Sequence, residues 1–335
     1  MAATKKTPLI TVLGSLNIDL VSYVPHHPLP GETLTSSSFA VSPGGKGANQ
    51  AVACAKLSRS RGGAPHADET ARIRMVGAVG ADTYGGLLTS NLAAHGVDTS
   101  GVSAAAELKT GVAVIIVDEP TGQNRIILSP EANHSLRASQ FSPTLPGPGP
   151  APDLLIMQLE IPLDAVLAAL ASARAASVPV LLNPAPAQPL PASAYGGLAH
   201  LVVNETEAAI LAGVPESALD DKAGLERVGR VFLGRGVRNV IVTLGGRGVF
   251  YMTAAAEGGK EGEEEKKGLV PAEKAKVVDT TAAGDTFVGQ YALEVVSHPG
   301  GAFDIEAAVK KANRAAAKTV EKLGAQDSIP WRDEL

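Results

Sequence analysis

A run of small side chains that ends in an acid is the first place in this sequence where chemistry could occur. Residues 279–287 read DTTAAGDTF, and the pattern that follows predicts a helix from Asp285 to about Val296. Small residues before a helix leave its first N–H groups open, so these donors and the helix dipole can bind a phosphate. Asp285 could then accept the proton of a hydroxyl group that attacks phosphorus.

The same run has a structural explanation. Asp285 could be an N-cap that accepts hydrogen bonds from its own helix, and Gly284 could allow tight packing against a neighbour. The run by itself is compatible with both explanations.

A second run, residues 43–49, reads PGGKGAN. Its glycines let backbone approach a ligand closely, while Lys46 and Asn49 offer directed polar contacts. A Walker A loop is excluded because the pattern GxxxxGK[ST] is absent. Asn17 and Asp19 follow the first predicted strand, where an amide and a carboxylate could bind the hydroxyl groups of a sugar. Turn-forming residues remain the simpler explanation of each feature taken alone.

Two more polar runs follow predicted strands. Residues 243–248, TLGGRG, could lie under a nucleotide, although a hairpin turn explains the glycines equally well. Asn204 and Glu207 are three residues apart at the start of a predicted helix, on one face, where they could hold metal-bound water near phosphates. A first helical turn enriched in acids is the alternative for that pair.

The elements that must position these residues alternate between short β-rich runs and longer helical patterns. This alternation predicts an α/β fold with a mainly parallel central sheet and helices on both faces. Two segments, 18–42 and 97–128, carry β-type runs without a helix and predict a small β-sheet lid. The α/β core would then comprise residues 1–17, 43–96 and 129–335. Proline, glycine and charge predict surface insertions at residues 58–71, 142–152 and 257–268.

The composition narrows the class of protein. The chain has 335 residues and a net charge of −5, which argues against a general affinity for nucleic acid. One cysteine, Cys54, allows no intrachain disulfide and favours a reducing compartment. No signal peptide and no apolar run of roughly 20 residues is found, so we expect a cytoplasmic protein without membrane spans, with the nucleus left open.

Taken together and in this order, the motifs resemble those of the PfkB-type carbohydrate kinase family, to which the ribokinases belong. The similar segments extend over nearly the whole chain: residues 13–19, 44–50, 157–160, 183–187, 204–207, 243–248, 279–287 and 324–326. The resemblance implies the Rossmann-like ribokinase fold with a β-sheet lid. It also implies an ATP-dependent phosphotransferase that phosphorylates D-ribose at O5.

The resemblance also implies a role for each matching residue. Asp285 would be the general base, and the anion hole would be formed by Ala282, Ala283 and Gly284. The sugar would be bound by Asn17, Asp19, Gly45, Lys46, Gly47, Asn49, Glu160 and Asp285. The nucleotide would be contacted by Asn204, Glu207, Thr243, Leu244, Gly245, Gly246, Arg247, Gly248, Gly284 and Asn313. Asn313 departs from the family, which often has histidine at that position.

Two ions and a dimer are implied as well. Glu207 would hold Mg²⁺ through water. K⁺ would be bound mostly by backbone oxygens and would order the anion-hole loop, with a site built from Asp279, Thr281, Thr319, Lys322, Gly324 and Ser328. The family lid often pairs with a second lid, so we expect a homodimer.

Other functions remain open at this point. A sister kinase of the family could act on deoxyribose, fructose, a ketodeoxy sugar acid or a nucleoside, although the polar set at Asn17, Asp19, Lys46 and Asn49 favours a small sugar over a nucleoside. A catalytically silent sugar sensor would keep the fold for binding, but it would need neither Asp285 nor Glu207. A Rossmann dehydrogenase is disfavoured, because no GxGxxG follows the first strand.

Overall fold

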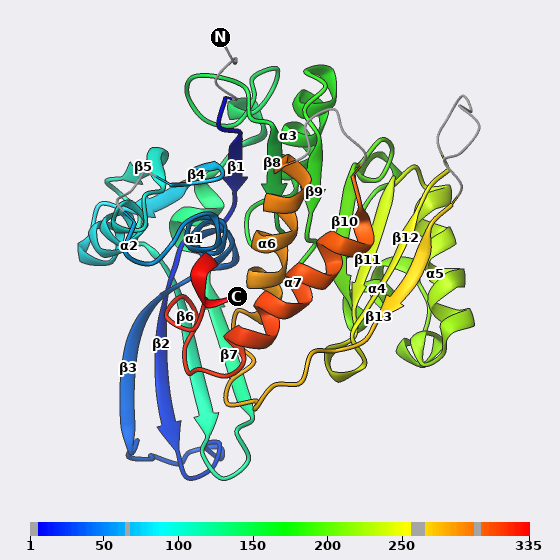
Figure 1. Cartoon of the computed structure of the whole chain (residues 1–335). Coiled ribbons are helices and arrows are strands. Elements are labelled where there is room, and N and C mark those ends of the chain that lie inside the picture. The colour runs from blue at the N-terminus through cyan, green and yellow to red at the C-terminus, as the bar shows by residue number, and fades with distance from the viewer. Residues whose placement is uncertain (1–5, 64–67, 256–264, 298–302) are drawn as a thin grey trace.

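The strands form two sheets in the computed structural model, which describes residues 6–63, 68–255, 265–297 and 303–335. Within these residues, a nine-stranded sheet has the order β13-β12-β11-β10-β9-β8-β1-β4-β5 (Figure 1). A four-stranded sheet has the order β3-β2-β6-β7. The predicted α/β class with a second, smaller sheet is therefore confirmed.

The large sheet is mainly parallel. Only the pairs β11–β12 and β12–β13, at one edge, are antiparallel. The strands are β1 (Leu9–Leu13), β4 (Arg72–Gly80), β5 (Asp98–Ala105), β8 (Leu154–Met157), β9 (Val180–Leu182), β10 (His200–Asn204), β11 (Asn239–Thr243), β12 (Val249–Thr253) and β13 (Lys267–Val270).

Helices cover both faces of this sheet (Figure 1). Its central strands are apolar at successive positions because both faces are buried. In β1, Ile10 and Val12 belong to the core under α1 (Lys46–Ser58), α2 (Thr83–Ala94), α6 (Ala283–Ser297) and α7 (Ile305–Thr319). Leu13 belongs to the opposite core, under α3 (Leu163–Ala175), α4 (Glu205–Ala212) and α5 (Lys222–Gly234).

The small sheet extends away from the body beyond the carboxyl end of β1 (Figure 1). It contains β2 (Asn17–Val24), β3 (Ser38–Gly44), β6 (Gly111–Asp118) and β7 (Asn124–Ser129). The first predicted lid segment, 18–42, matches β2 and β3. The second predicted segment begins too early at residue 97, because β5 pairs in parallel with β4 in the large sheet. Strand β4, helix α2 and strand β5 form a βαβ crossover. The sequence analysis did not predict it, because the sequence of β5 is only weakly apolar.

Three local features of the described chain bear on its helices and loops. Asp82 caps α2, since its carboxylate accepts a hydrogen bond from the backbone N–H of Gly85. Residues 142–152 contain neither helix nor strand. The predicted insertion 58–71 includes residues 64–67, outside the described residues, and most of the predicted insertion 257–268 also lies outside them. None of the described helices is long and apolar enough to span a membrane.

Candidate active site

Asp285 lies in the first turn of α6, and its side chain is buried, with 8% of the residue exposed. Its carboxylate accepts two hydrogen bonds from α1, one from Asn49 Nδ2 to Oδ2 (3.1 Å) and one from Gln50 Nε2 to Oδ1 (2.9 Å). An N-cap would instead accept from the N–H groups of its own helix. The capping explanation of Asp285 is therefore wrong.

The backbone before α6 opens onto empty space. Ala282 has a φ of 59°, a left-handed conformation that turns the chain into the helix. A Cβ atom added to Gly284 would meet no atom within 4 Å, so this glycine is not needed for packing. Gly284 therefore borders open space at the start of α6, as an anion hole requires, whereas the Ala283 N–H donates to the Thr280 carbonyl (3.3 Å).

In contrast to Gly284, two glycines of the second run, residues 43–49, are required by the backbone conformation or by close packing. Gly45 has a φ of 88°, which glycine adopts without strain. A Cβ atom on Gly47 would lie 2.6 Å from the backbone of Gly14 and Ser15. These contacts hold the start of α1 against the turn between β1 and β2, and so bring Asn49 toward Asp285.

The residues expected to bind a sugar lie together beside this turn. The Glu160 Oε2 atom accepts hydrogen bonds from Ser15 Oγ (2.5 Å), from the Lys46 backbone N–H (3.0 Å) and from Asn17 Nδ2 (3.4 Å). Asn17 Oδ1 in turn accepts from Asn133 Nδ2 (2.8 Å). Asp19 is buried on β2. Polar donors and acceptors therefore converge on one small volume next to Asp285.

Three carboxyl groups share this volume, and their charges interact. Burial raises the pKa of Asp19 to about 7, and the negative charges of Glu160 and Asp285 add to the effect. Burial by itself would lower the pKa of the Lys46 ammonium, but Asp285, Glu160 and Glu207 outweigh it and raise that pKa. Lys46 is therefore the cation that offsets this acidic cluster.

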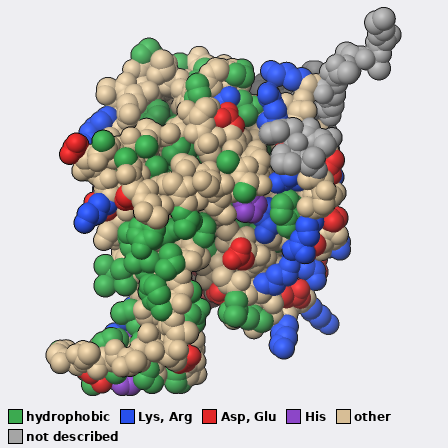
Figure 2. Space-filling model, turned by 90° about the vertical axis from the view of Figure 1, so that its left-hand side faces the viewer, with side chains coloured by type: hydrophobic (Ala, Val, Ile, Leu, Met, Phe, Trp, Pro, Cys, Tyr) green, Lys and Arg blue, Asp and Glu red, His purple; other side chains and the backbone are tan. Residues whose placement is uncertain are grey.

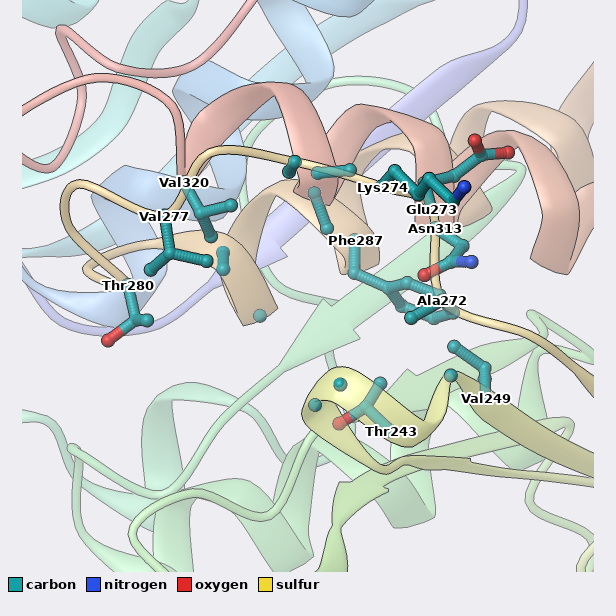
Figure 3. Close-up of a pocket in the computed structure, with 18 residues that line it drawn as sticks. Thr243, Val249, Ala272, Glu273, Lys274, Val277, Thr280, Phe287, Asn313 and Val320 are labelled. Carbon is teal, nitrogen blue, oxygen red and sulfur yellow. The ribbon is translucent and has the colours of Figure 1, made fainter.

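Two cavities meet at Gly284. The larger, about 530 Å³, lies between α6 and α7 on one side and the β11–β12 turn on the other (Figure 3). Phe287, Val249 and Ala272 line its apolar end, where Asn313 donates a hydrogen bond to the Pro271 carbonyl (2.8 Å). A second cavity, about 440 Å³, is lined by Lys46, Asn204, Glu207, Ala282 and Asp285. The residues that line both are Thr243, Gly245, Thr280 and Gly284.

Two residues of the expected nucleotide set lie away from both cavities. Leu244 is buried in the core under α3 and α5. The Arg247 guanidinium contacts the Glu205 carboxylate (2.6 Å) and the carbonyl groups of Leu219 and Asp220. Gly246 and Gly248, by contrast, line the larger cavity.

Asn204 and Glu207 have a local role besides lining the second cavity. Asn204 Oδ1 accepts from the Glu207 N–H (2.8 Å), and Glu207 Oε2 accepts from the Asn204 N–H (2.9 Å), which forms the capping box of α4. Burial raises the pKa of Glu207, while the Asn204 N–H and the Lys46 charge oppose that rise. A bound cation would favour its ionised form.

The residues expected to bind K⁺ lie in two segments, 279–281 and 319–328, that contact each other in the fold. Asp279 accepts from the N–H and the hydroxyl of Thr281 through Oδ1, and from the Gly324 N–H through Oδ2 (2.9 Å). Ser328 donates to the Ala325 carbonyl, and the Thr319 carbonyl accepts from the Lys322 N–H. Among the described residues no cluster of three His, Cys, Asp or Glu could hold a metal ion.

The structure adds site residues to which the sequence analysis gave no role. Gln50, Ser15 and Asn133 contact predicted site residues directly, and Gln326 Nε2 donates to Asn49 Oδ1 (3.0 Å). Gln50 and Gln326 both lie inside segments that resemble the family. The resemblance to the family thus included both glutamines, but no local sequence pattern indicated that either amide lies near Asp285.

Comparisons with known proteins agree with this geometry. The family described as pfkB family carbohydrate kinase matches residues 7–332. The ribokinase of Schizosaccharomyces pombe is 42% identical over 96% of this chain and 94% of the relative. The deoxyribokinase of Salmonella typhimurium is 34% identical over 96% and 95%. A structure of Arabidopsis thaliana ribokinase complexed with ribose and ATP is similar with a TM-score of 0.81, at 28% identity, over 98% of this chain and 97% of the other.

The raised pKa of Asp19 predicts that this carboxyl destabilises the ligand-free protein at neutral and higher pH. The folded state binds a proton more tightly than the unfolded state, so between about pH 4 and pH 7 stability falls as pH rises. We expect Asp19→Asn to raise the free energy of unfolding at pH 8 by on the order of 4 kcal/mol. The gain should fade toward pH 4.

Urea unfolding at pH 4.5, 6 and 8 measures this, with the exposed Asp220→Asn as control. An equal gain at pH 4.5 and pH 8 would contradict the prediction. Sugar binding should weaken in Asp19→Asn, although the protein becomes more stable.

Proposed function

This chain belongs to the pfkB family of carbohydrate kinases, and we propose that it transfers the γ-phosphoryl group of ATP to O5 of D-ribose. The products are D-ribose 5-phosphate and ADP. The observation that carries this proposal is the place of Asp285, a buried carboxylate aligned by Asn49 and Gln50 beside the open start of α6. Ribose is favoured by the ribokinase relative and by the similar structure that holds ribose and ATP.

The residues divide the reaction between them. Asp285 accepts the proton of the sugar hydroxyl while that oxygen forms a bond to the γ-phosphorus, and the bond from phosphorus to the departing ADP oxygen breaks. The N–H group at Gly284, with the dipole of α6, stabilises negative charge on the phosphoryl group, and Ala282 and Ala283 complete the loop that presents it. Asn17, Asp19 and the other polar groups near Glu160 orient the sugar, which reduces the entropic cost of the reaction.

The two cavities accommodate the nucleotide. The apolar end near Phe287 and Val249 suits the base, and the cavity beside Lys46 and Glu207 suits the phosphates. Asn204 and Glu207 would hold Mg²⁺ through water, and the ion would neutralise phosphate charge. The segments around Asp279 and Gly324 would hold K⁺. That position is next to the backbone that leads into Ala282, so the ion would stabilise the anion hole.

The choice of sugar is tested by ADP release with ribose, deoxyribose, fructose and adenosine, each with and without K⁺. We expect ribose to give the highest kcat/KM and K⁺ to raise it. A higher value for deoxyribose would move the chain to the activity named for its Salmonella relative. Ribose binding without any ADP release would instead indicate a sensor.

The role of the base is tested by Asp285→Ala. The variant should lose about a thousandfold or more in kcat, because it lacks the carboxylate proposed to accept the hydroxyl proton, while the sugar still binds. Calorimetry measures the binding, and ADP release measures turnover. Near-normal turnover would remove Asp285 as the base.

We further propose that two chains associate through the small sheet. Its register puts Val41, Leu20, Val114 and Ile127 in one row across the four strands, so they share a face. Val41 and Ile127 are 45% and 62% exposed, and Figure 2 shows hydrophobic side chains gathered over this part of the molecule. An apolar face of this kind on the lid suits a second copy of the same sheet.

Ile127→Glu should therefore convert a dimer into a monomer, because it puts a charge into the proposed interface. Sedimentation equilibrium measures the mass. Ile210→Glu is the matched control, since Ile210 is 47% exposed on α4, outside the small sheet. A dimer that survives Ile127→Glu would contradict the lid interface.

A further inference from the structure

The Asp285 carboxylate depends on amide groups, and an amide can present either of two ends. Only the NH₂ end of Asn49 and of Gln50 can donate to a carboxylate, whereas the carbonyl end would repel it. The active arrangement therefore needs something that keeps both NH₂ groups facing Asp285. The structure contains a separate glutamine behind each of these amides.

Gln326 orients the Asn49 amide. Its Nε2 donates to Asn49 Oδ1 (3.0 Å), so the oxygen of Asn49 faces Gln326 and the nitrogen faces Asp285. Gln326 is itself held, because its Oε1 accepts from Asn91 Nδ2 (2.6 Å). It is also buried, so water does not compete readily for these bonds.

Gln158 orients the Gln50 amide in the same way. Its Nε2 donates to Gln50 Oε1 (2.6 Å), so the Gln50 nitrogen faces Asp285 Oδ1 and also Asn183 Oδ1 (3.0 Å). Gln158 Oε1 is buried and has no hydrogen-bond partner among the described residues. The unpaired oxygen lies at the far end of the chain of amides, where it is remote from the base.

We propose that Gln50 and Gln326 are positioning residues for the base: Gln50 aligns one oxygen of Asp285 directly, and Gln326 aligns the other through Asn49. The proposal rests on the function proposed above. It connects the C-terminal segment to the reaction, because residue 326 is 277 positions from Asn49 in the chain.

Loss of either glutamine side chain should act on kcat. Without Gln326, the Asn49 amide can rotate and bring its oxygen toward Asp285. The carboxylate then lacks one fixed donor and leaves the geometry needed for proton transfer. The backbone near residue 326 is held independently, since Lys56 Nζ donates to the Gln326 carbonyl (3.0 Å). A side-chain substitution therefore leaves this anchor in place.

The test compares Gln326→Leu and Gln50→Leu with Gln290→Leu. Gln290 is also buried, lies on α6 and donates to Glu294, outside the amide network. We expect kcat to fall about tenfold in Gln326→Leu and about a hundredfold in Gln50→Leu, with KM for ATP changed by less than about twofold. The control should keep kcat within about twofold.

The pH profile separates positioning from general loss of structure. Removing a donor to the charged form favours the neutral form, so the acid limb of the kcat profile should move to higher pH in both variants but not in the control. Trp331 is the only tryptophan, and Lys56 and Arg59 lie over its ring at 5.5 Å and 5.0 Å. Its fluorescence reports whether the C-terminal segment remains folded.

The outcomes distinguish the two proposals. Full activity in Asp285→Ala would overturn the proposed base. An inactive Asp285→Ala with unchanged kcat and pH profile in both glutamine variants would overturn only the positioning roles. If a leucine variant changes the fluorescence of Trp331, the uncharged Gln326→Met and Gln50→Met, which keep the length of the side chain and lose the donor, decide by the same two measurements.

Discussion

A carboxylate buried between two helices is the constraint on which the rest of this site depends. An ionised group can stay in the interior only if hydrogen bonds replace its lost hydration. Asp285 on α6 obtains them from Asn49 and Gln50 on α1, so α1 and α6 must pack closely. One turn further along α6, a Cβ atom on Gly289 would lie 2.6 Å from the Cβ of Ala53. Small residues one turn beyond the polar contacts thus set the distance at which the donors reach Asp285.

The same volume holds more negative charge than a stable core would contain. The negative charges of Glu160 and Asp285 act on Asp19, and Lys46 adds a positive charge beside them. Polar groups of the sugar would complete the hydrogen bonds that the protein leaves unmade. The arrangement is therefore more favourable with the substrate than without it, which is how binding sites commonly lose stability in exchange for function.

The position of the site follows from the topology. In parallel sheets, loops at the carboxyl ends of the strands collect the functional side chains. Here β1 continues into β2 of the small sheet, and the chain returns through β3 into α1. The small sheet and α1, whose amides contact Asp285, are thus connected through one short stretch of chain. Movement of the small sheet would therefore displace Gly45 and Lys46 directly.

The sequence by itself determined the α/β class, the strands β2 and β3 of the small sheet, and the polar and glycine-rich runs that line part of the two cavities. These features leave local signals, such as apolar periodicity, runs of glycine and small residues before a helix. Only the tertiary structure decided that Asp285 is not a cap, that β5 belongs to the large sheet, and that Leu244 and Arg247 lie away from the cavities. It also revealed the contact of Gln326 with Asn49 and the raised pKa of Asp19. These depend on which side chains meet across long separations in the chain, and on the burial that results, and no local pattern contains that information.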